Sequence, residues 1–397
     1  MKYSAQLTAA FYIFLFFCTL LHASHFLNYT YNSPIDFRNV YLGARCWFQG
    51  ENAYDDAVLK QEWQQVCEHE QLENTLPPGL PQNSLVYPPS AFPVYWVLAL
   101  LPWKWAAILN LLFSCVALVL IVWLARNYFD LTRVPFGLLL LVVCAFKGTF
   151  HALLVGQPTF LFMLLALSSL YFLNQHRHRI AAVMLGISMC KPTLVLPFVL
   201  YLLVKRQYKP VFFASLLQLS LAGIAFLFFK QPMVLIDGFS ANINALMDMV
   251  YVQGNIYYMR TLTDLGVWVN YLFNNSYSLW KTVQNILLVA GAFLFWYKPP
   301  HNKLVLFSAI ALITLLLSYH LFYDVLILIP LVGLITSSSM NYKIMAACLA
   351  LPLFLPVNGL LDRTAAGELF PLLYLHLPIV LLALAGWLAA YLRLNHR

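Results

Sequence analysis

The chain has 397 residues, of which 62% are apolar and only 10% are charged. Soluble globular domains carry about 25% charged residues, so this composition excludes a water-soluble protein and indicates one that resides in a lipid bilayer. The formal net charge of +8 does not indicate nucleic-acid binding, because no basic cluster with interleaved aromatic residues accompanies it.

The first apolar run, Leu7–Leu27, follows a single early lysine, Lys2. The small residues around Ala23 would also suit the cleavage site of a signal peptide. We expect the run to be retained as the first span, because it is long enough to cross a bilayer and more apolar runs follow.

Ten further apolar runs lie between Trp105 and Tyr391, and several of them are shorter than a full span. Short runs in a membrane protein are accommodated by tilt or by burial in the bundle. The pattern predicts an all-α, polytopic transmembrane helical bundle of roughly 10–12 spans, with residues 1–397 forming one integral membrane domain.

Two apolar segments are irregular. The run Ser90–Leu101 lies between prolines and is too short to cross, so we expect it to dip into the membrane and return. The run Ile180–Val204 is interrupted by Lys191 and Pro192. A proline beside a charge in mid-run predicts two half-helices that form a hairpin.

If Ser90–Leu101 re-enters on one side and Ile180–Val204 forms a hairpin, the basic residues gather on one side of the membrane. The segments assigned to that side hold 13 Lys or Arg and one acid, Asp130, which predicts that this side is cytoplasmic and that both termini lie there. Those segments are 1–6, 126–133, 174–179, 205–210, 298–303, 338–343 and 392–397. The loops 28–86 and 230–278 are then extracytoplasmic, on the outer face of a plasma (inner) membrane, and the first of them carries eight of the fifteen acids.

The first loop begins with Asp36, close to the end of the first span. If a helix starts there, Arg38, Tyr41 and Arg45 share one of its faces, because they are three and four residues apart. Asp36 is either the N-cap of that helix or a catalytic carboxylate.

Other polar residues stand in or beside apolar runs. Lys191 is costly within a membrane, so it indicates either an anionic ligand or a structural ion pair with Asp36 or Asp324. Gln157 opens a helix on the outer side, where it either binds substrate or makes a helix-packing hydrogen bond. His320 and Asp324 are four residues apart and can share a helical face.

The sequence contains no HExxH motif, no carboxylate cage and no set of cysteine ligands, so we expect neither a metal nor another cofactor. Asp55 and Asp56 alone would make a weak divalent site. Cys46 and Cys67 both lie in the outer loop, and a disulfide between them is expected if that compartment is oxidising.

An ordered set of segments resembles glycosyltransferase family 87. These are D-F-x-x-x-Y-x-G from Asp36 to Gly43, YPPS (87–90), GQPTFLFMLLAL (156–167), LGISMCKPTLVLPF (185–198) and SYHLFYD (318–324). The resemblance covers about residues 10–340, whereas the C-terminal spans carry no matching motif. The acidic stretch of the first loop departs from the family pattern, and it comprises Glu62, Glu68, Glu70 and Glu73.

The resemblance implies a GT-C fold with the catalytic acid in the first extracytoplasmic loop. It also implies a polyprenyl-phosphate-linked sugar as donor, commonly mannose, and metal-independent transfer on the periplasmic side to a glycolipid or glycan acceptor. Asp36 matches the catalytic aspartate, and Lys191 and His320 match contacts to the donor phosphate. Arg38 and Arg260 are further candidates for that phosphate.

The remaining candidates concern the sugar. Gln157 and Asp324 are expected to bind substrate, and Tyr41, Tyr87, Tyr257 and Tyr258 suit sugar stacking, although aromatic residues also form membrane-interface belts. A lipid-linked-solute transporter or flippase is the alternative, because a broken helix at Lys191 is also typical of transporters. A non-catalytic scaffold is a third reading. A transferase would have a pocket that opens to one face only.

Overall fold

The computed structural model describes residues 2–28, 34–72, 85–229, 231–252, 260–273, 277–362 and 371–395. Within these residues the regular structure is helical, with one isolated bridge between Leu262 and Leu321. The prediction of an all-α polytopic bundle is confirmed.

The helices of the first half follow in this order: α1 (Lys2–Asn28), α2 (Ile35–Phe48), α3 (Asp56–Glu70), α4 (Ala91–Ala99), α5 (Trp103–Tyr128), α6 (Phe136–Ala145), α7 (Lys147–Leu154), α8 (Thr159–Asn174), α9 (His178–Ser188), α10 (Pro192–Val204) and α11 (Tyr208–Leu227). The second half contains α12 (Met233–Met247), the π-helix η1 (Asp248–Val252), α14 (Gly266–Phe273), α15 (Tyr277–Tyr297), α16 (Lys303–Leu317), the 3-10 helix η2 (Phe322–Leu328), α17 (Ile329–Ser337), α18 (Met340–Ala350), η3 (Leu351–Leu353), α19 (Val357–Leu361), η4 (Pro371–Leu375) and α21 (His376–Asn395).

By length and composition, four helices of the described chain can cross a membrane, or five if one bent pair counts as a single span. Seven shorter apolar helices accompany them. One of the four, Met233–Tyr251, lies within the segment 230–278 that was predicted to be a loop. The number of crossings, expected at roughly 10–12, stays a prediction.

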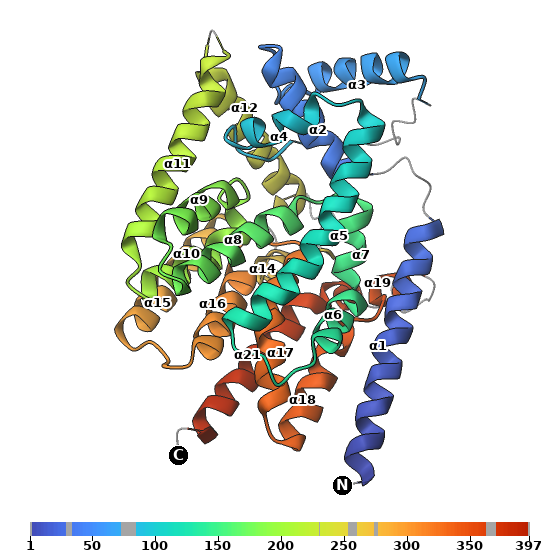
Figure 1. The fold of residues 1–397 in the computed structure, drawn as a ribbon, viewed down its shortest axis with the longest axis vertical. Coiled ribbons are helices and arrows are strands. Elements are labelled where there is room, and N and C mark those ends of the chain that lie inside the picture. The colour runs from blue at the N-terminus through green and yellow to red at the C-terminus, as the bar shows by residue number, and fades with distance from the viewer. Residues whose placement is uncertain are drawn as a thin grey trace.

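The start of α1 and the end of α21 lie at one end of the molecule, and α2, α3 and α4 lie at the other (Figure 1). α1 packs lengthwise against α6, where Leu15 and Cys18 are buried with Val142 and Ala145. The outward face of α5 exposes apolar side chains such as Leu112 and Val116. Apolar surface of this extent suits contact with lipid.

Two breaks in the apolar runs shape the interior. The predicted break into two half-helices is confirmed, because α9 ends at Ser188 and α10 begins at Pro192. The hairpin that they were expected to form stays a prediction. A second break, between α6 and α7, was not predicted: these helices are bent by 68° at Phe146. The run from Val134 to Phe150 is therefore not one straight helix.

The acidic first loop is folded onto the bundle. Glu62 on α3 pairs with Arg45 on α2 at 2.6 Å, and Glu70 accepts the backbone N–H groups of Trp103 at 2.6 Å and Lys104 at 3.3 Å. The Glu70 carboxylate thus satisfies orphan donors at the positive end of α5. Asp55 accepts the N–H of Ala57 and caps α3, which gives it a structural role in place of the weak metal site considered above.

The predicted disulfide is absent, because Cys46 and Cys67 are both free and buried in the structure. Both thiols are instead packed as small apolar groups in the core.

Candidate active site

The first turn of α2 is docked on the end of α7. The backbone N–H groups of Asp36 and Phe37 both donate to the carbonyl oxygen of Val155, at 2.9 and 3.3 Å. The N-cap position of α2 is Pro34, and Asp36 stands inside the first turn without capping it. The N-cap interpretation of Asp36 is therefore wrong, and its carboxylate is available for other contacts.

A glycine turn between α7 and α8 presents Gln157 to that carboxylate. Gly156 has φ of +68°, and a Cβ there would lie 2.7 Å from the Cβ of Phe37 and 2.9 Å from that of Pro34. Only glycine combines this backbone conformation with such close approach. The Gln157 side-chain N–H then donates to Oδ2 of Asp36, and its Oε1 accepts from the Tyr87 hydroxyl at 3.1 Å.

Lys191 lies at the break between α9 and α10 and is 8% exposed. Its ammonium donates to Oδ1 of Asp324 at 3.0 Å, to Oε1 of Gln157 at 3.3 Å and to the Thr159 hydroxyl. These three bonds use all three donors of an ammonium group. The ammonium also lies 4.7 Å from the centre of the Tyr323 ring. The structural ion pair with Asp324 that was considered for Lys191 is thus formed.

His320 and Asp324 meet as predicted, although a 3-10 turn rather than an α-helix joins them. Nδ1 of His320 lies 3.3 Å from Oδ2 of Asp324, and His320 is fully buried. Since a carboxylate only accepts hydrogen bonds, Nδ1 carries the proton in this contact. The other ring nitrogen, Nε2, has no hydrogen-bond partner within the described part of the chain.

These contacts join residues from distant parts of the chain into one polar network. It runs from Asp36 through Gln157 and Lys191 to Asp324 and His320, and all but Asp36 are almost fully buried. Asp36 and Tyr87 are half-buried, so the network meets its surroundings at the Asp36 end.

The Asp36 carboxylate is electrostatically unusual. Burial raises the pKa of Asp36 to about 6, even though the hydrogen bond from Gln157 and the charges of Lys191 and Arg38 act in the opposite direction. A carboxylate with a pKa near 6 is ionised at neutral pH and still basic enough to take up a proton. Such tuning is typical of catalytic acids and bases.

Two predicted residues are held in the packing of the first loop. Arg38 is buried, with its guanidinium carbon 5.0 Å from the centre of the Trp63 ring, and one of its terminal nitrogens finds no partner among the described residues. Tyr41 is fully buried against Trp103, and its hydroxyl donates to the carbonyl of Leu101 at 2.8 Å. In this structure Tyr41 serves the packing of α2.

Arg260 lies in a second polar cluster rather than in the Asp36 network. Its guanidinium donates to both oxygens of Asp362, at 3.0 and 3.1 Å, and lies over the ring of Tyr374. Tyr257 and Tyr258 lie outside the described residues. Within those residues, no group of three or more His, Cys, Asp or Glu side chains is arranged to hold a metal ion.

The family model of glycosyltransferase family 87 matches residues 85–319, which is more than half of the chain. The chain belongs to this family. The match includes Tyr87, Gln157 and Lys191, and it ends one residue before His320. No curated protein and no solved structure matches the chain.

Family 87 membership makes the chain a membrane glycosyltransferase and confirms the family resemblance read from the sequence. Two residues of the network were not singled out beforehand, namely Thr159 and Tyr323, which both contact Lys191. Thr159 was visible as part of the GQPT segment, two residues after Gln157. Nothing in the sequence marked Tyr323 apart from its place beside Asp324.

Proposed function

We propose that this glycosyltransferase moves a hexose, most simply mannose, from a polyprenyl-phosphate carrier to a hydroxyl group of a glycolipid or glycan. The observation that carries the proposal is the Asp36 carboxylate, whose pKa is raised to about 6 by burial. Gln157 links this carboxylate to a buried network that includes a lysine and a histidine. A carboxylate and cations at one site suit a reaction in which a proton leaves an acceptor and a phosphate departs.

In the proposed reaction, the acceptor oxygen attacks the anomeric carbon of the sugar and its proton passes to Asp36. The bond between that carbon and the phosphate oxygen breaks, and the polyprenyl phosphate leaves with the bonding electrons. Oδ2 of Asp36 is engaged by Gln157, so Oδ1 takes the proton. A single displacement of this kind inverts the anomeric configuration and requires no metal ion for its balance.

Lys191, through its charge, and His320, as an imidazolium that donates from Nε2, are the proposed contacts to the departing phosphate. Asp324 accepts hydrogen bonds from both side chains, which holds them side by side and orients the imidazole with Nε2 directed away from the carboxylate. Charged and hydrogen-bonding groups fixed in advance stabilise developing charge without reorganisation. Tyr87 holds the Gln157 side chain, and Gln157 in turn fixes the position of the Asp36 carboxylate.

The proposal is tested by the fate of labelled donor. Purified protein incubated with polyprenyl-phosphate sugars should release polyprenyl phosphate and label an acceptor, because transfer breaks the sugar–phosphate bond. A transporter would move the donor and leave that bond intact.

We predict that the pH dependence of transfer reports Asp36 and responds to Gln157. Transfer should rise with pH through a midpoint near 6 and then level off, because the base must be ionised. In Gln157→Ala the hydrogen bond that lowers the pKa of Asp36 is lost, so the midpoint should move to higher pH. Initial rates measured from pH 5 to pH 8 give both midpoints.

The matched control for this experiment is Gln218→Ala. Gln218 donates to the Ser90 hydroxyl and is not bonded to Asp36, so its loss should leave the midpoint unchanged. An unshifted midpoint in Gln157→Ala would show that the amide does not tune the Asp36 carboxylate.

We also propose that the site faces the extracytoplasmic side of the plasma membrane. A reporter fused after Arg397 should be active in the cytoplasm, and one inserted near Asn74 should be active outside, because the basic residues gather on the side of the termini. Both fusion points lie outside the described residues. Cytoplasmic activity of the Asn74 reporter would reverse the assignment of faces.

A further inference from the structure

A short segment, residues 261–265, runs antiparallel beside the part of the chain that carries His320. The N–H of Thr263 donates to the carbonyl oxygen of His320 at 3.1 Å, and the N–H of Phe322 donates to the carbonyl oxygen of Thr261 at 2.8 Å. His320 therefore lies between two backbone hydrogen bonds that come from the same segment. We call residues 261–265 the strap.

Two further hydrogen bonds fix the strap to the end of α16. The Thr263 hydroxyl donates to the carbonyl oxygen of Leu315 at 3.0 Å, and the N–H of Leu265 donates to that of Leu316 at 2.9 Å. These carbonyl groups belong to the last turn of the helix, where no partner exists within the helix itself. The strap thus joins α16 to the segment of His320.

The side chain of Asp264 anchors the strap to two other helices. Asp264 is fully buried, and its Oδ2 accepts a hydrogen bond from the Tyr251 hydroxyl at 2.7 Å. Its Oδ1 accepts the N–H of Gly266 at 2.9 Å. Tyr251 belongs to η1 and Gly266 begins α14, so one carboxyl group connects both helices to the strap.

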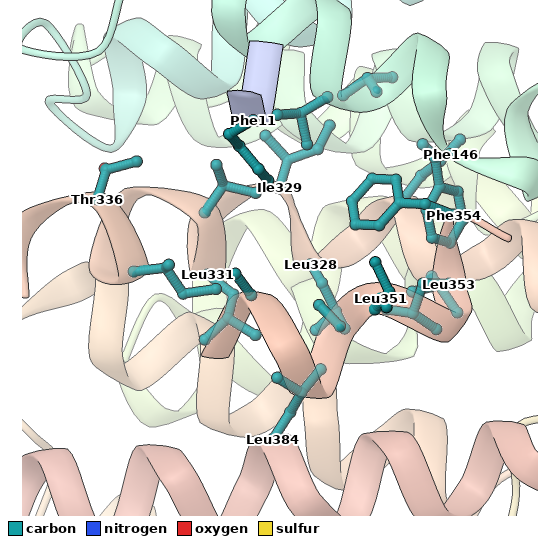
Figure 2. A pocket seen from close by; sticks show the side chains of 18 of the residues that line it. Phe11, Phe146, Leu328, Ile329, Leu331, Thr336, Leu351, Leu353, Phe354 and Leu384 are labelled. Carbon is teal, nitrogen blue, oxygen red and sulfur yellow. The ribbon is translucent and has the colours of Figure 1, made fainter. Parts of the chain in front are cut away.

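On another side, the segment that follows His320 has weaker support. η2 is a 3-10 helix of seven residues, longer than the usual run of about three or four. Leu328 of η2 and Ile329 of α17 line an apolar cavity of about 320 Å³, which Figure 2 shows. Side chains beside a void lack partner atoms there, so this side restrains η2 less than a filled core would. The hydrogen bonds of the strap act where such restraint is needed.

We propose that Asp264, acting through the strap, is a positioning residue for His320 in sugar transfer. This role rests on the function proposed above, in which Nε2 of His320 donates to the departing phosphate. A donor that is fixed in advance stabilises developing charge without reorganisation, and a misplacement of about 1 Å can cost about 10²-fold in rate. Asp264 does not itself contact the phosphate in this scheme.

The anchor works through hydrogen bonds rather than through charge. Burial raises the pKa of Asp264 to about 7, so the carboxyl group is partly protonated at neutral pH. Asparagine offers the same acceptor oxygen to the N–H of Gly266, and Asp264→Asn should therefore retain most of the anchoring. Asp264→Ala removes both hydrogen bonds.

Chemical labelling of His320 tests whether the strap holds it, independently of sugar transfer. The full chain in detergent is treated with diethyl pyrocarbonate, which modifies accessible imidazoles, and the labelled peptides are quantified by mass spectrometry. Because His320 is fully buried, its labelling should be slow in the wild type. Tyr251→Phe removes one anchoring hydrogen bond and should raise this labelling about tenfold through local opening. Asp264→Ala should raise it at least as much.

Two controls separate local opening from general unfolding. His22 is also buried, with its ring bonded to the carbonyl oxygen of Phe354, and it should stay protected in every variant. Tyr128→Phe is the matched substitution, because it removes a buried hydroxyl that bonds to Tyr201 at 3.1 Å, and it should leave His320 protected.

Two labelling results would overturn the proposal. One is wild-type protection of His320 in Tyr251→Phe, and the other is an equal rise at His320 and His22. If Asp264→Ala does not fold, Tyr251→Phe still decides.

A double-mutant cycle then tests whether Asp264 acts through His320 during transfer. Asp264→Ala should lower kcat about 10–100-fold when His320 is present. It should change kcat by less than about twofold in His320→Ala, because no positioned imidazole is left to lose. Asp264→Asn should restore most of the rate.

Equal losses of kcat in both backgrounds would give Asp264 a general structural role and would overturn the proposal. If the wild type transfers no sugar from any donor, the function proposed above fails. The labelling result would still decide whether Asp264 holds His320 in place.

Discussion

Replacing Asp36 with asparagine should reduce sugar transfer by about 10²–10⁴-fold, the usual contribution of general-base assistance. Asparagine has the same shape as aspartate, but it cannot accept a proton from the acceptor hydroxyl at neutral pH. Its side-chain oxygen can still accept the hydrogen bond from Gln157, so the docking of α2 on α7 should persist. Initial rates of transfer and the thermal unfolding temperature are measured for the same variant. A loss of rate without a loss of unfolding temperature assigns the effect to the chemistry and not to folding.

The matched control for this substitution is Asp55→Asn. Asp55 caps α3, and asparagine caps about as well as aspartate, so both transfer and stability should stay close to the wild type. Near-normal transfer by folded Asp36→Asn would remove Asp36 as the base and would direct attention to Asp324, which lies in the same network.

The second large effect should come from Lys191→Met, which leaves the buried carboxylate of Asp324 without its lysine partner and with only neutral or histidine donors beside it. Breaking a buried ion pair by removing one member destabilises a protein by about 3–5 kcal/mol. The double variant Lys191→Met with Asp324→Asn removes both charges and should recover most of that stability. The thermal unfolding temperature in detergent is measured for the wild type, the single variant and the double variant.

The same pair of variants separates the two roles of Lys191. If Lys191 also contacts the donor phosphate, the double variant should regain stability while donor use stays impaired. If the lysine serves the fold alone, stability and donor use should return together. An unchanged unfolding temperature in the single variant would contradict the buried ion pair itself.

The sequence predicted the elements of the site better than their contacts. A charge beside proline in an apolar run was sufficient to predict the break at Lys191, because an ammonium in a membrane needs a partner and proline ends hydrogen bonding. The sequence did not show whether the partner of Lys191 is Asp36 or Asp324. Both acids are more than a hundred residues away from Lys191 along the chain. Only the packing of η2 beside α8 brings Asp324 within reach of the lysine.

Other features were missed because their cause lies in the tertiary structure. The bend at Phe146 carries no proline or glycine at its centre, so the apolar run that contains it read as one helix. The acidic residues Glu62 and Glu70 were interpreted only as a departure from the family pattern. In the structure they hold α3 to α2 and cap α5, which becomes apparent only when the loop is folded onto the bundle. Arg260 was expected to contact the donor phosphate together with Lys191 and His320. In the structure it instead forms an ion pair with Asp362, outside the Asp36 network.

The most direct measurement is donor consumption by the purified protein, given a panel of polyprenyl-phosphate sugars labelled in the sugar and a mixture of glycolipid acceptors. The account predicts that the wild type releases polyprenyl phosphate from at least one donor and forms a product of inverted anomeric configuration, while Asp36→Asn does so about 10²–10⁴-fold more slowly. If the folded wild type leaves every donor in the panel intact but carries one across a vesicle membrane, the transfer reaction proposed for Asp36 is contradicted.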